Sequence, residues 1–343
     1  MLIFALNCGS SSLKCAAIDT DRRSHVLDVR VEEVDQALER LREESAPPDA
    51  VVHRIVHGGE RFLHATRIDD GVLSEIEQLS RLAPLHNPPA LAAIRQARTA
   101  YPQAPQVAVF DTAFHSTLPA HAREYALPRD LRERFGIRRY GFHGISHAHV
   151  MHAVATQLNL PLEKLRIVSC HLGNGASVAA IEHGRSVDTS MGMTPLEGLV
   201  MGTRAGDLDP GILLELVRSG SFDGEELDAL FNRQSGMAGL TGTNDMREIE
   251  RRAAAGDQDC RRALALYAYR VRKYIGAYAA VMGGVDAIAF TGGVGENSAT
   301  IRQACLERLE FLGAAVVVVK ADEELAMALE AAALLDSNAT SSS

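Results

Sequence analysis

The sequence lacks the clustered positive charge that nucleic-acid binding requires. Its 343 residues carry a formal net charge of −9, and no run of basic residues interrupts that balance. Because a nucleic-acid partner calls for a concentrated basic surface, we expect none. An anionic substrate must therefore be met locally, by individual arginines and backbone amides.

Long apolar runs and paired cysteines are also missing. The apolar stretch 275–290 is broken by Gly283, Gly284 and Asp286 and is too short to span a bilayer. Residues 1–7 have no basic flank or cleavage site of a signal peptide, so they predict a strand. The five cysteines form no CxxC pair, which favours small buried residues in a reducing compartment over disulfides or zinc ligands. We expect a cytoplasmic protein with no membrane partner.

Two common nucleotide-binding motifs are absent. Without GxxxxGK[ST] the chain is not a P-loop enzyme, and without GxGxxG after a strand it is not a dinucleotide oxidoreductase. What the chain has instead is glycine-rich turns that follow apolar strands. Predicted strands 2–7 and 13–18 flank the first turn, which contains Gly9 and three serines.

The same pattern returns in the second half of the chain. Predicted strands 167–171 and 177–181 flank a turn at Gly173-Asn174-Gly175. Gly173 lies 164 positions after Gly9, roughly half the chain. We interpret this as a duplication of one unit, with one copy in each of two domains, as the length also suggests.

A third glycine turn, 292–297, follows a predicted strand at 287–290 and leads into a predicted helix at 298–312 with Asn297 as its N-cap. Further predicted helices cover 28–44, 257–282 and 322–335, further strands cover 51–56 and 106–110, and 338–343 is predicted to be a disordered tail. One glycine turn alone is usually just a tight turn. Three such turns, each exposing backbone N–H groups where a strand ends, favour phosphate binding.

Two arginines are placed to bind an anion. Arg54 lies at the end of a strand, and Arg204 lies between Gly202 and Gly206. A guanidinium can hold a carboxylate or phosphoryl group with two parallel hydrogen bonds, although a surface ion pair is the alternative for each.

Histidines and carboxylates provide further candidates. His143 and His147 have i,i+4 spacing, but Gly141 and Gly144 disfavour the helix that a zinc site would need, so a hydrogen bond from His143 to a phosphoryl oxygen is the better interpretation. His171 either contacts phosphate or fixes its own turn. Asp111 follows a buried strand, where α/β enzymes place functional groups. Glu323 and Glu324 open the last helix, as helix-dipole partners or as magnesium ligands.

The motifs together resemble the acetate kinases, the acetokinase family of short-chain carboxylate kinases. They run in family order over most of the chain: 7–14 (NCGSSSLK), 54–60 (RIVHGGE), 85–89 (LHNPP), 110–115 (FDTAFH), 140–147 (YGFHGISH), 170–175 (CHLGNG), 191–204 (MGMTPLEGLVMGTR) and 290–297 (FTGGVGEN).

The resemblance implies an α/β fold of two duplicated actin-like (ribonuclease H-like) ATPase domains with a nucleotide cleft between them. Residues 1–114 with 323–343 would form the N-terminal domain, to which the C-terminal helix returns, and 115–322 would form the nucleotide-binding domain. Relative to the family, the stretch between Ile18 and Val51 is short, the segment 312–322 is compressed, and Ala321 replaces the usual threonine.

The resemblance also implies roles for individual residues. The catalytic group would be Arg54, Asp111, His143 and Arg204; the carboxylate would contact Arg54, Val56, Leu85, Phe142 and Pro195. The nucleotide would contact Ser12, Lys14, His171, Asn174, Gly175, Asp245, Met246, Arg247, Gly293, Val294 and Asn297. Asn7 and Glu323 would hold the metal.

The implied activity is reversible, magnesium-dependent phosphoryl transfer between ATP and acetate, giving acetyl phosphate and ADP by in-line displacement. Mn²⁺ could replace Mg²⁺, and a homodimer is expected. A kinase for propionate or another short acid, or one that uses pyrophosphate, is the nearest alternative. An ATP-gated binding protein of the actin or Hsp70 kind is the alternative from another class.

Overall fold

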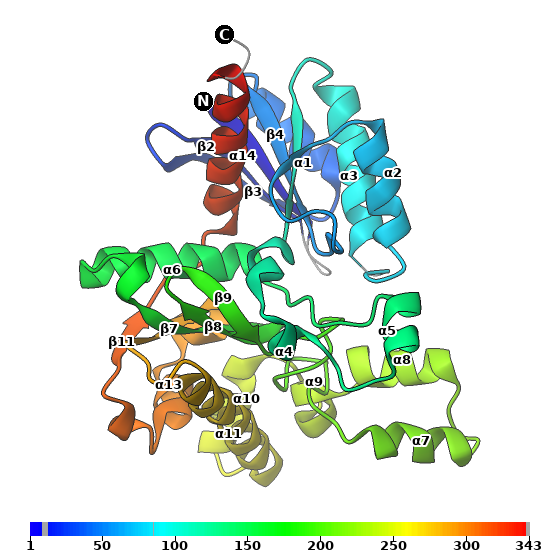
Figure 1. The fold of residues 1–343 in the computed structure, drawn as a ribbon, viewed down its shortest axis with the longest axis vertical. Helices are drawn as coiled ribbons and strands as arrows, with labels where there is room; N and C mark the ends of the chain where they lie inside the picture. Colours follow the sequence, from blue (N-terminus) through cyan, green and yellow to red (C-terminus); the bar gives the residue numbers. More distant parts are fainter. Residues whose placement is uncertain (9–12, 85, 341–343) are drawn as a thin grey trace. The chain divides into compact units, whose positions relative to one another are not determined.

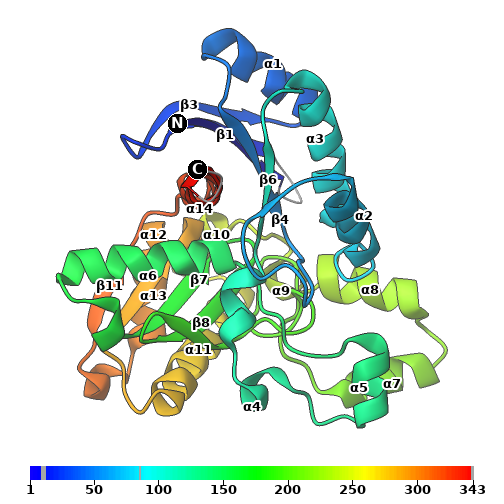
Figure 2. The same cartoon turned by 45° about the horizontal axis from the view of Figure 1, so that its top comes forward.

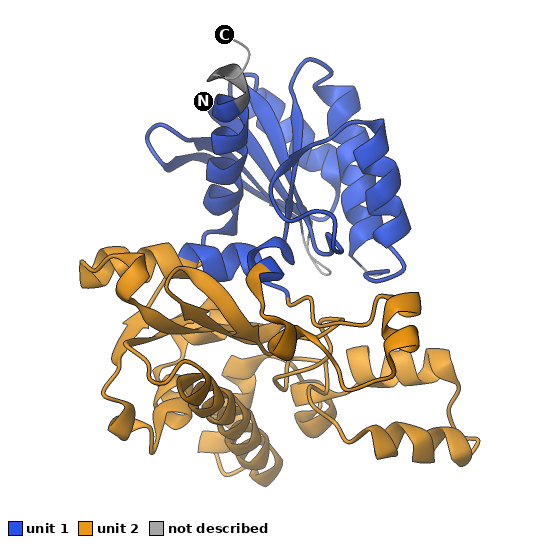
Figure 3. Cartoon of the chain, in the orientation of Figure 1, with its two compact units in different colours: residues 1–116, 142–149, 322–343 blue, residues 117–141, 150–321 orange. Residues whose placement is uncertain are grey.

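The computed structural model describes residues 1–8, 13–84 and 86–340, which form a mixed α/β fold with two β-sheets (Figure 1). The chain divides into two compact units (Figure 3). Unit 1 comprises Met1–Ser116, Phe142–His149 and Asp322–Ser343, and unit 2 comprises Thr117–Gly141 and Val150–Ala321. A short stretch from the middle of the chain and the C-terminal helix therefore both belong to the N-terminal unit.

Unit 1 contains a six-stranded sheet with the order β3-β2-β1-β4-β6-β5. Its strands are β1 (Leu2–Cys8), β2 (Leu13–Asp19), β3 (Ser24–Val31), β4 (Ala50–Ile55), β5 (Thr66–Arg67) and β6 (Gln106–Phe110). β1, β4 and β6 are parallel neighbours, whereas β2, β3 and β5 run antiparallel to the strands beside them. The carboxyl ends of β1, β4 and β6 therefore meet at one edge of the sheet.

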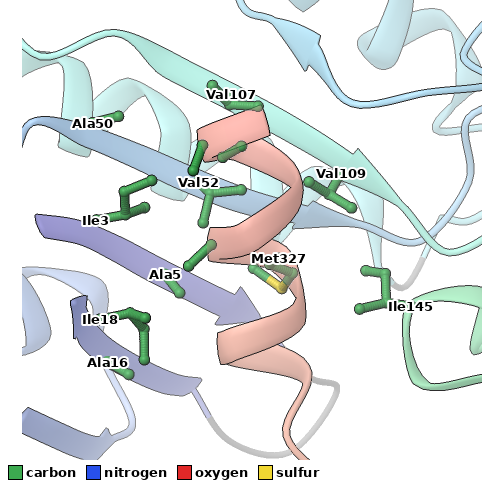
Figure 4. Close-up of a cluster of buried hydrophobic side chains, with 13 residues drawn as sticks. Ile3, Ala5, Ala16, Ile18, Ala50, Val52, Val107, Val109, Ile145 and Met327 are labelled. Carbon is green, nitrogen blue, oxygen red and sulfur yellow. The ribbon is translucent and has the colours of Figure 1, made fainter. Parts of the chain in front are cut away.

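Helices cover both faces of this sheet. They are α1 (Val34–Glu44), α2 (Asp70–Leu79), α3 (Asn87–Ala100) and α14 (Glu323–Thr340). Figure 2 shows α14 on one side of β1 and β4 and the other three helices on the opposite side. Successive side chains of β1 point to opposite faces of the sheet. Ile3 and Ala5 pack with Met327 of α14 (Figure 4), while Phe4 and Leu6 pack with residues of α1 and α3. Burial on both faces explains why these strands are continuous apolar runs.

Unit 2 repeats the sheet of unit 1. Its five strands have the order β11-β10-β7-β8-β9 and are β7 (Arg166–Leu172), β8 (Ala176–Glu182), β9 (Arg185–Thr189), β10 (Ala287–Thr291) and β11 (Ala315–Val318). β7, β10 and β11 are parallel, and β8 and β9 are antiparallel extensions. This is the arrangement of β1, β4, β6, β2 and β3.

The two copies agree in register as well as in order. Seven residue pairs join β1 to β2, and seven join β7 to β8. The pairing between the second and third strands of each copy has a register shift, at Ala17/Ile18 of β2 in unit 1 and at Ala180/Ile181 of β8 in unit 2. These shifts lie 163 positions apart. The duplication predicted from the glycine turns is thus confirmed, as is the α/β fold class.

The other helices that the structure describes belong to unit 2, except that η1 and α6 include residues of both units. They are the 3-10 helices η1 (Ala113–Thr117), η2 (Leu162–Lys164) and η3 (Glu310–Leu312), and α4 (Ala120–Arg123), α5 (Arg129–Phe135), α6 (Gly144–Leu158), α7 (Pro210–Arg218), α8 (Gly224–Arg233), α9 (Gly236–Thr241), α10 (Met246–Ala254), α11 (Gln258–Val281), α12 (Gly292–Asn297) and α13 (Ala299–Leu306). In the described part of the chain, none is long and apolar enough to cross a membrane.

Three predicted elements were partly wrong. The predicted helix 28–44 begins at Val34, because 28–31 continue an edge strand in which every second side chain is covered. The turn 292–297 is itself the short helix α12, and Ser298, not Asn297, caps the next helix by accepting from the Ile301 N–H. The predicted tail is helical through Thr340. The first glycine turn, 9–12, lies outside the described residues.

A helix also forms where glycines were expected to prevent one. α6 begins at Gly144 and includes His147. His143 precedes it with a φ of 57°, in the left-handed region that side chains rarely adopt.

His53, in the centre of β4, is buried and uncharged. Its Nε2 lies 2.8 Å from Oε1 of Gln106 on the neighbouring strand. Burial lowers the pKa of His53 to about 4, although the hydrogen bond with Gln106 opposes this. In the unfolded chain the imidazole would take up a proton near pH 6.5, so acid favours unfolding.

We therefore expect His53 to make the protein acid-sensitive. The stability that depends on its neutral form is complete above about pH 6.5 and is lost as the pH falls toward 4; the loss should be about 2 kcal/mol between pH 7.5 and pH 5. His53→Gln, which cannot titrate, should remove that part of the pH dependence. Denaturant unfolding of both proteins at the two pH values measures it, and parallel pH slopes would contradict the assignment.

Candidate active site

Unit 1 carries an ion pair at the edge of its sheet where the parallel strands end. Arg54, near the end of β4, and Asp111, directly after β6, lie on neighbouring strands. Arg54 Nε donates to both carboxylate oxygens of Asp111 at 3.1 Å, and Nη2 donates to Oδ2 at 2.6 Å. Their side chains are 13% and 2% exposed, so water contributes little to this pair.

Two further elements complete this cluster. Arg54 Nη1 donates to Asn7 Oδ1 on β1 at 3.0 Å and lies 3.5 Å from Glu323 Oε2. The Asn7 amide donates to Glu323 at 3.0 Å and to Glu324 at 2.7 Å, at the first turn of α14. Residues from β1, β4, the end of β6 and α14 thus share one hydrogen-bond network.

The charge of this cluster is unbalanced toward the negative. Burial lowers the pKa of the Arg54 guanidinium, but the charges of Asp111, Glu323 and Glu324 outweigh it, and the pKa is raised. Three carboxylates therefore surround one fixed cation. The described residues contain no group of three His, Cys, Asp or Glu placed to hold a metal ion alone. The carboxylate and amide oxygens suit Mg²⁺, which usually takes only one or two carboxylates and completes its shell with water and phosphate oxygens.

Asp111 also fixes the segment that carries His143. The backbone N–H of His143 hydrogen-bonds the Asp111 carboxylate, and the Gly144 N–H donates to the Asp111 carbonyl at 2.9 Å. A Cβ on Gly144 would lie 2.2 Å from that carbonyl oxygen, so only glycine fits. The left-handed backbone of His143 is held by these contacts, and such strain is typical of functional positions.

Val56 and Phe142, the predicted carboxylate contacts in unit 1, are both buried. His57 follows Val56 in the sequence, and the centre of its ring lies 5.5 Å from that of Phe142, edge-on. Asn87 holds His57 in place by accepting from its N–H at 3.2 Å and donating to its carbonyl at 3.1 Å. Asn87 was not selected from the sequence, although it belongs to the LHNPP motif. Leu85 lies outside the described residues.

In unit 2, the glycine turns approach one another. The Gly202 N–H donates to the Asn174 carbonyl at 2.8 Å, and Asn244 donates to Asn174 Oδ1 at 3.0 Å. A Cβ on Gly173 would lie 4.0 Å from the Gly293 nitrogen. The turn after β7, the segment before Arg204 and the start of α12 therefore meet, as phosphate-binding turns should.

The nucleotide candidates in α12 and α10 are open to solvent. The Asn297 amide donates to the Gly293 carbonyl at 2.8 Å, and a Cβ on Gly293 would meet nothing within 4 Å. Asp245 caps α10 by accepting from the Arg247 N–H at 3.0 Å, and its side chain also pairs with the exposed Arg247 guanidinium. Val294 and Met246 are partly exposed on the same two helices.

Arg204 differs sharply from Arg54. It is half-buried, and its Nη1 donates to the Pro195 carbonyl at 3.3 Å and lies 3.8 Å from the Met201 sulfur. Across the described residues no carboxylate charge acts on it. Burial lowers the pKa of the Arg204 guanidinium. A desolvated cation with one long hydrogen bond is a place where an anion would be stabilising.

The predicted site residues thus fall into two groups, one in each unit. Unit 1 brings together Asn7, Arg54, Asp111, His143 and Glu323, with Val56 and Phe142 nearby; unit 2 contains His171, Asn174, Gly175, Pro195, Arg204, Asp245, Met246, Arg247, Gly293, Val294 and Asn297. Lys14 lies opposite Asn7 in the β1–β2 pairing, and Ser12 lies outside the described residues. The roles assigned to these residues stay predictions.

Comparison with known proteins gives consistent relatives. Residues 21–332 match the Acetokinase family. An acetate kinase of Clavibacter michiganensis is 57% identical over 270 residues, covering 79% of this chain and 68% of the relative.

Among solved structures, Porphyromonas gingivalis acetate kinase has a TM-score of 0.90 at 37% identity, covering 97% of this chain and 99% of the other. A propionate kinase from Francisella tularensis has a TM-score of 0.89 at 35% identity, covering 96% and 98%. With a family match over most of its length and relatives of this similarity, the chain belongs to the acetokinase family.

Proposed function

We propose that the protein is an acetate kinase that transfers a phosphoryl group reversibly between ATP and acetate. The observation that carries this is Arg204, a desolvated guanidinium without a carboxylate partner in the described chain, hydrogen-bonded to Pro195 of the predicted carboxylate pocket. Family membership supports the same chemistry. A cytoplasmic location is part of the proposal.

The acceptor needs little activation, because a carboxylate is already nucleophilic at neutral pH. What the enzyme supplies is in-line placement and neutralisation of the charge on the transferring group. In this mechanism Arg54 and Arg204 bind the carboxylate and the phosphoryl oxygens, His143 donates to the phosphoryl group, and Asp111 keeps Arg54 and the His143 backbone in place. Asn7 and Glu323 would hold Mg²⁺, which neutralises phosphate charge when bound.

The nucleotide would be held mainly by backbone groups. Asn174, Gly175, Gly293 and Asn297 belong to the turns that meet in unit 2, and we expect backbone N–H groups of these turns to bind the phosphate oxygens. His171, Val294 and the segment 245–247 would complete the contacts, with Ser12 and Lys14 on the first hairpin.

The pocket residues Val56, Leu85, Phe142 and Pro195 favour a short acid. One methylene is worth only about 1–3 kcal/mol in such a pocket, so propionate is the nearest alternative substrate. A hydroxamate assay for acyl phosphate over C1 to C4 acids, with ATP against pyrophosphate, separates the candidates. ATP hydrolysis that ignores added acid, with no acyl phosphate, would favour the actin-like binding protein instead.

Arg204→Ala should abolish most of the activity. If the guanidinium stabilises the transition state, kcat should fall on the order of 10²-fold or more while the fold is retained. Arg261→Ala is the matched control, because Arg261 also donates to a backbone carbonyl of unit 2, at Ala253, away from the glycine turns. Near-normal turnover of the Arg204 variant would refute the mechanism.

Gly293→Ala tests the nucleotide site. Because no atom of the described residues lies within 4 Å of the added Cβ, the folded protein should lose no stability. If a phosphate occupies that space, the KM for ATP should rise about tenfold or more while the KM for acetate stays nearly constant. Gly276→Ala, also in open space on a helix, controls for backbone effects. An unchanged KM for ATP would remove Gly293 from the site.

We also propose a homodimer that uses α7. Helix α7 has no buried residue, and Ile212, Leu213, Leu214 and Val217 are all exposed. A nine-residue helix has little stability of its own and normally depends on a packed apolar face. Light scattering should find a dimer, and Leu214→Glu with Val217→Glu should give monomers. Phe311→Glu, at an exposed apolar side chain elsewhere, should leave the dimer intact. A dimer that survives the α7 changes would contradict this interface.

A further inference from the structure

The segment 191–206 of unit 2 carries both Pro195 and Arg204 and has no helix or strand of its own. Arg204 is held by one long hydrogen bond and a sulfur contact, both to residues of the same segment. The position of its guanidinium therefore depends on what fixes this segment. The second half of the segment is bound to other parts of unit 2, where the Gly202 N–H donates to the Asn174 carbonyl and the Ala205 N–H donates to the Phe231 carbonyl. The first half, 191–197, which carries Pro195, is bound by residues of the segment 117–141, far away in the sequence.

Glu197, two residues after Pro195, is the centre of these contacts. Its Oε1 accepts from Arg139 Nη2 at 2.5 Å, and its Oε2 accepts from the Tyr125 hydroxyl. The Tyr125 oxygen in turn accepts from the Met193 N–H at 3.2 Å. The Arg139 guanidinium also lies 5.6 Å from the centre of the Tyr125 ring. We call Tyr125, Arg139 and Glu197 the clamp.

The other nitrogen of the Arg139 fork holds the start of the segment. Nη1 donates to three successive carbonyls, those of Thr189 at 3.1 Å, Ser190 at 3.2 Å and Met191 at 3.0 Å. One guanidinium thus joins the end of β9 to Glu197 across the bend between them. Burial lowers the pKa of Arg139, but the charge of Glu197 outweighs it and the pKa is raised.

Gly192 shows how closely the clamp approaches the backbone. A Cβ there would lie 1.9 Å from Glu197 Oε2 and 2.2 Å from the Tyr125 hydroxyl, so a side chain cannot coexist with this pair. The Gly192 carbonyl accepts from the N–H groups of Tyr140 at 3.0 Å and Gly141 at 3.2 Å. Both the Arg139 side chain and the backbone of the two residues after it are therefore hydrogen-bonded to the segment.

The far end of the segment has a separate anchor. Asp207 accepts from the Gly198 N–H at 2.9 Å through Oδ1, and from the Tyr274 hydroxyl at 2.8 Å through Oδ2. With that end fixed to α11, the freedom left to the segment lies at Met191–Glu197, where the clamp acts.

We propose that Tyr125, Arg139 and Glu197 are positioning residues that fix Pro195 and Arg204 for the carboxylate side of the reaction. This rests on the function proposed above. A displacement of about 1 Å at a catalytic group can cost about 10²-fold in rate. The clamp acts on the segment that holds the acid, so its loss weakens use of the acid and leaves nucleotide binding intact.

Glu197→Gln keeps the size of the side chain and removes its charge. We expect kcat/KM for acetate to fall about 10- to 100-fold and the KM for ATP to stay within about twofold. Tyr125→Phe should act in the same direction more weakly. A double-mutant cycle compares Arg139→Gln, Glu197→Gln and the variant with both changes. The double variant should have a kcat/KM for acetate no lower than that of the poorer single variant, because each change already disrupts the same clamp.

Backbone amide exchange gives a readout that does not depend on turnover. In Glu197→Gln, amides of 192–197 should exchange faster, while those of β7 and β10 should not. The matched control is Asp286→Gln, which breaks the Arg166–Asp286 ion pair of 3.0 Å elsewhere in unit 2 and should leave the KM for acetate and exchange in 192–197 unchanged.

The outcomes separate the two proposals. A wild-type protein that forms no acyl phosphate refutes the proposed function, and exchange still tests the clamp. An active wild type with unchanged kinetics and exchange in Glu197→Gln overturns the clamp alone. Equal losses for acetate and ATP, or losses that Asp286→Gln reproduces, would also overturn it, because they indicate general destabilisation.

Discussion

The ion pair between Arg54 and Asp111 is the interaction on which unit 1 depends most. It joins neighbouring parallel strands at their carboxyl ends, and through Asn7 it reaches β1 and the first turn of α14. Removing one partner of a buried pair typically costs about 3–5 kcal/mol, whereas replacing both by apolar groups can be neutral. The pair is therefore better explained by what it orients than by the stability it adds. It sets the guanidinium, the Asp111 carboxylate and the backbone of His143 in one fixed arrangement.

The two arginines of the proposed site illustrate two electrostatic states of the same side chain. Arg54 has more negative charge around it than it needs, and its pKa is raised; Arg204 has none beside it in the described chain, and its pKa is lowered. The first is preorganised by the protein, and the second is left for a ligand to neutralise. A surplus of carboxylates near Arg54 suits a cation, and the deficit near Arg204 suits an anion, which agrees with the proposed magnesium-dependent transfer to a carboxylate.

The sequence predicted those features that depend on local pattern. Apolar runs beside glycine-rich turns located β1, β2, β7, β8 and β10, because strand and turn signals are local. The repetition of this pattern predicted the duplicated sheets. Residues 28–31 were misassigned because an edge strand with charged exposed residues has the composition of a helix. Asn297 was chosen as a cap where Ser298 serves, since both residues are good caps and sequence alone cannot rank neighbours.

Contacts between distant segments could not be predicted in this way. Tyr125 and Arg139 reach Glu197 across 72 and 58 residues, and neither belongs to a motif by itself. The only trace of them in the sequence is Gly192, whose lack of a side chain is required by the carboxylate and phenol above it.

Gly144 and Gly202 have similar explanations, because a Cβ would meet the Asp111 carbonyl in one case and the Asn174 amide in the other. Gly293 has none: no described residue occupies the space its side chain would take. Gly144 and Gly202 are explained by close packing within their own units, so they carry no direct information about a ligand. Open space alone does not point to a ligand, because Gly276 has it too. What sets Gly293 apart is its place at the start of α12, next to the turn after β7, and this is why the proposed nucleotide site includes it.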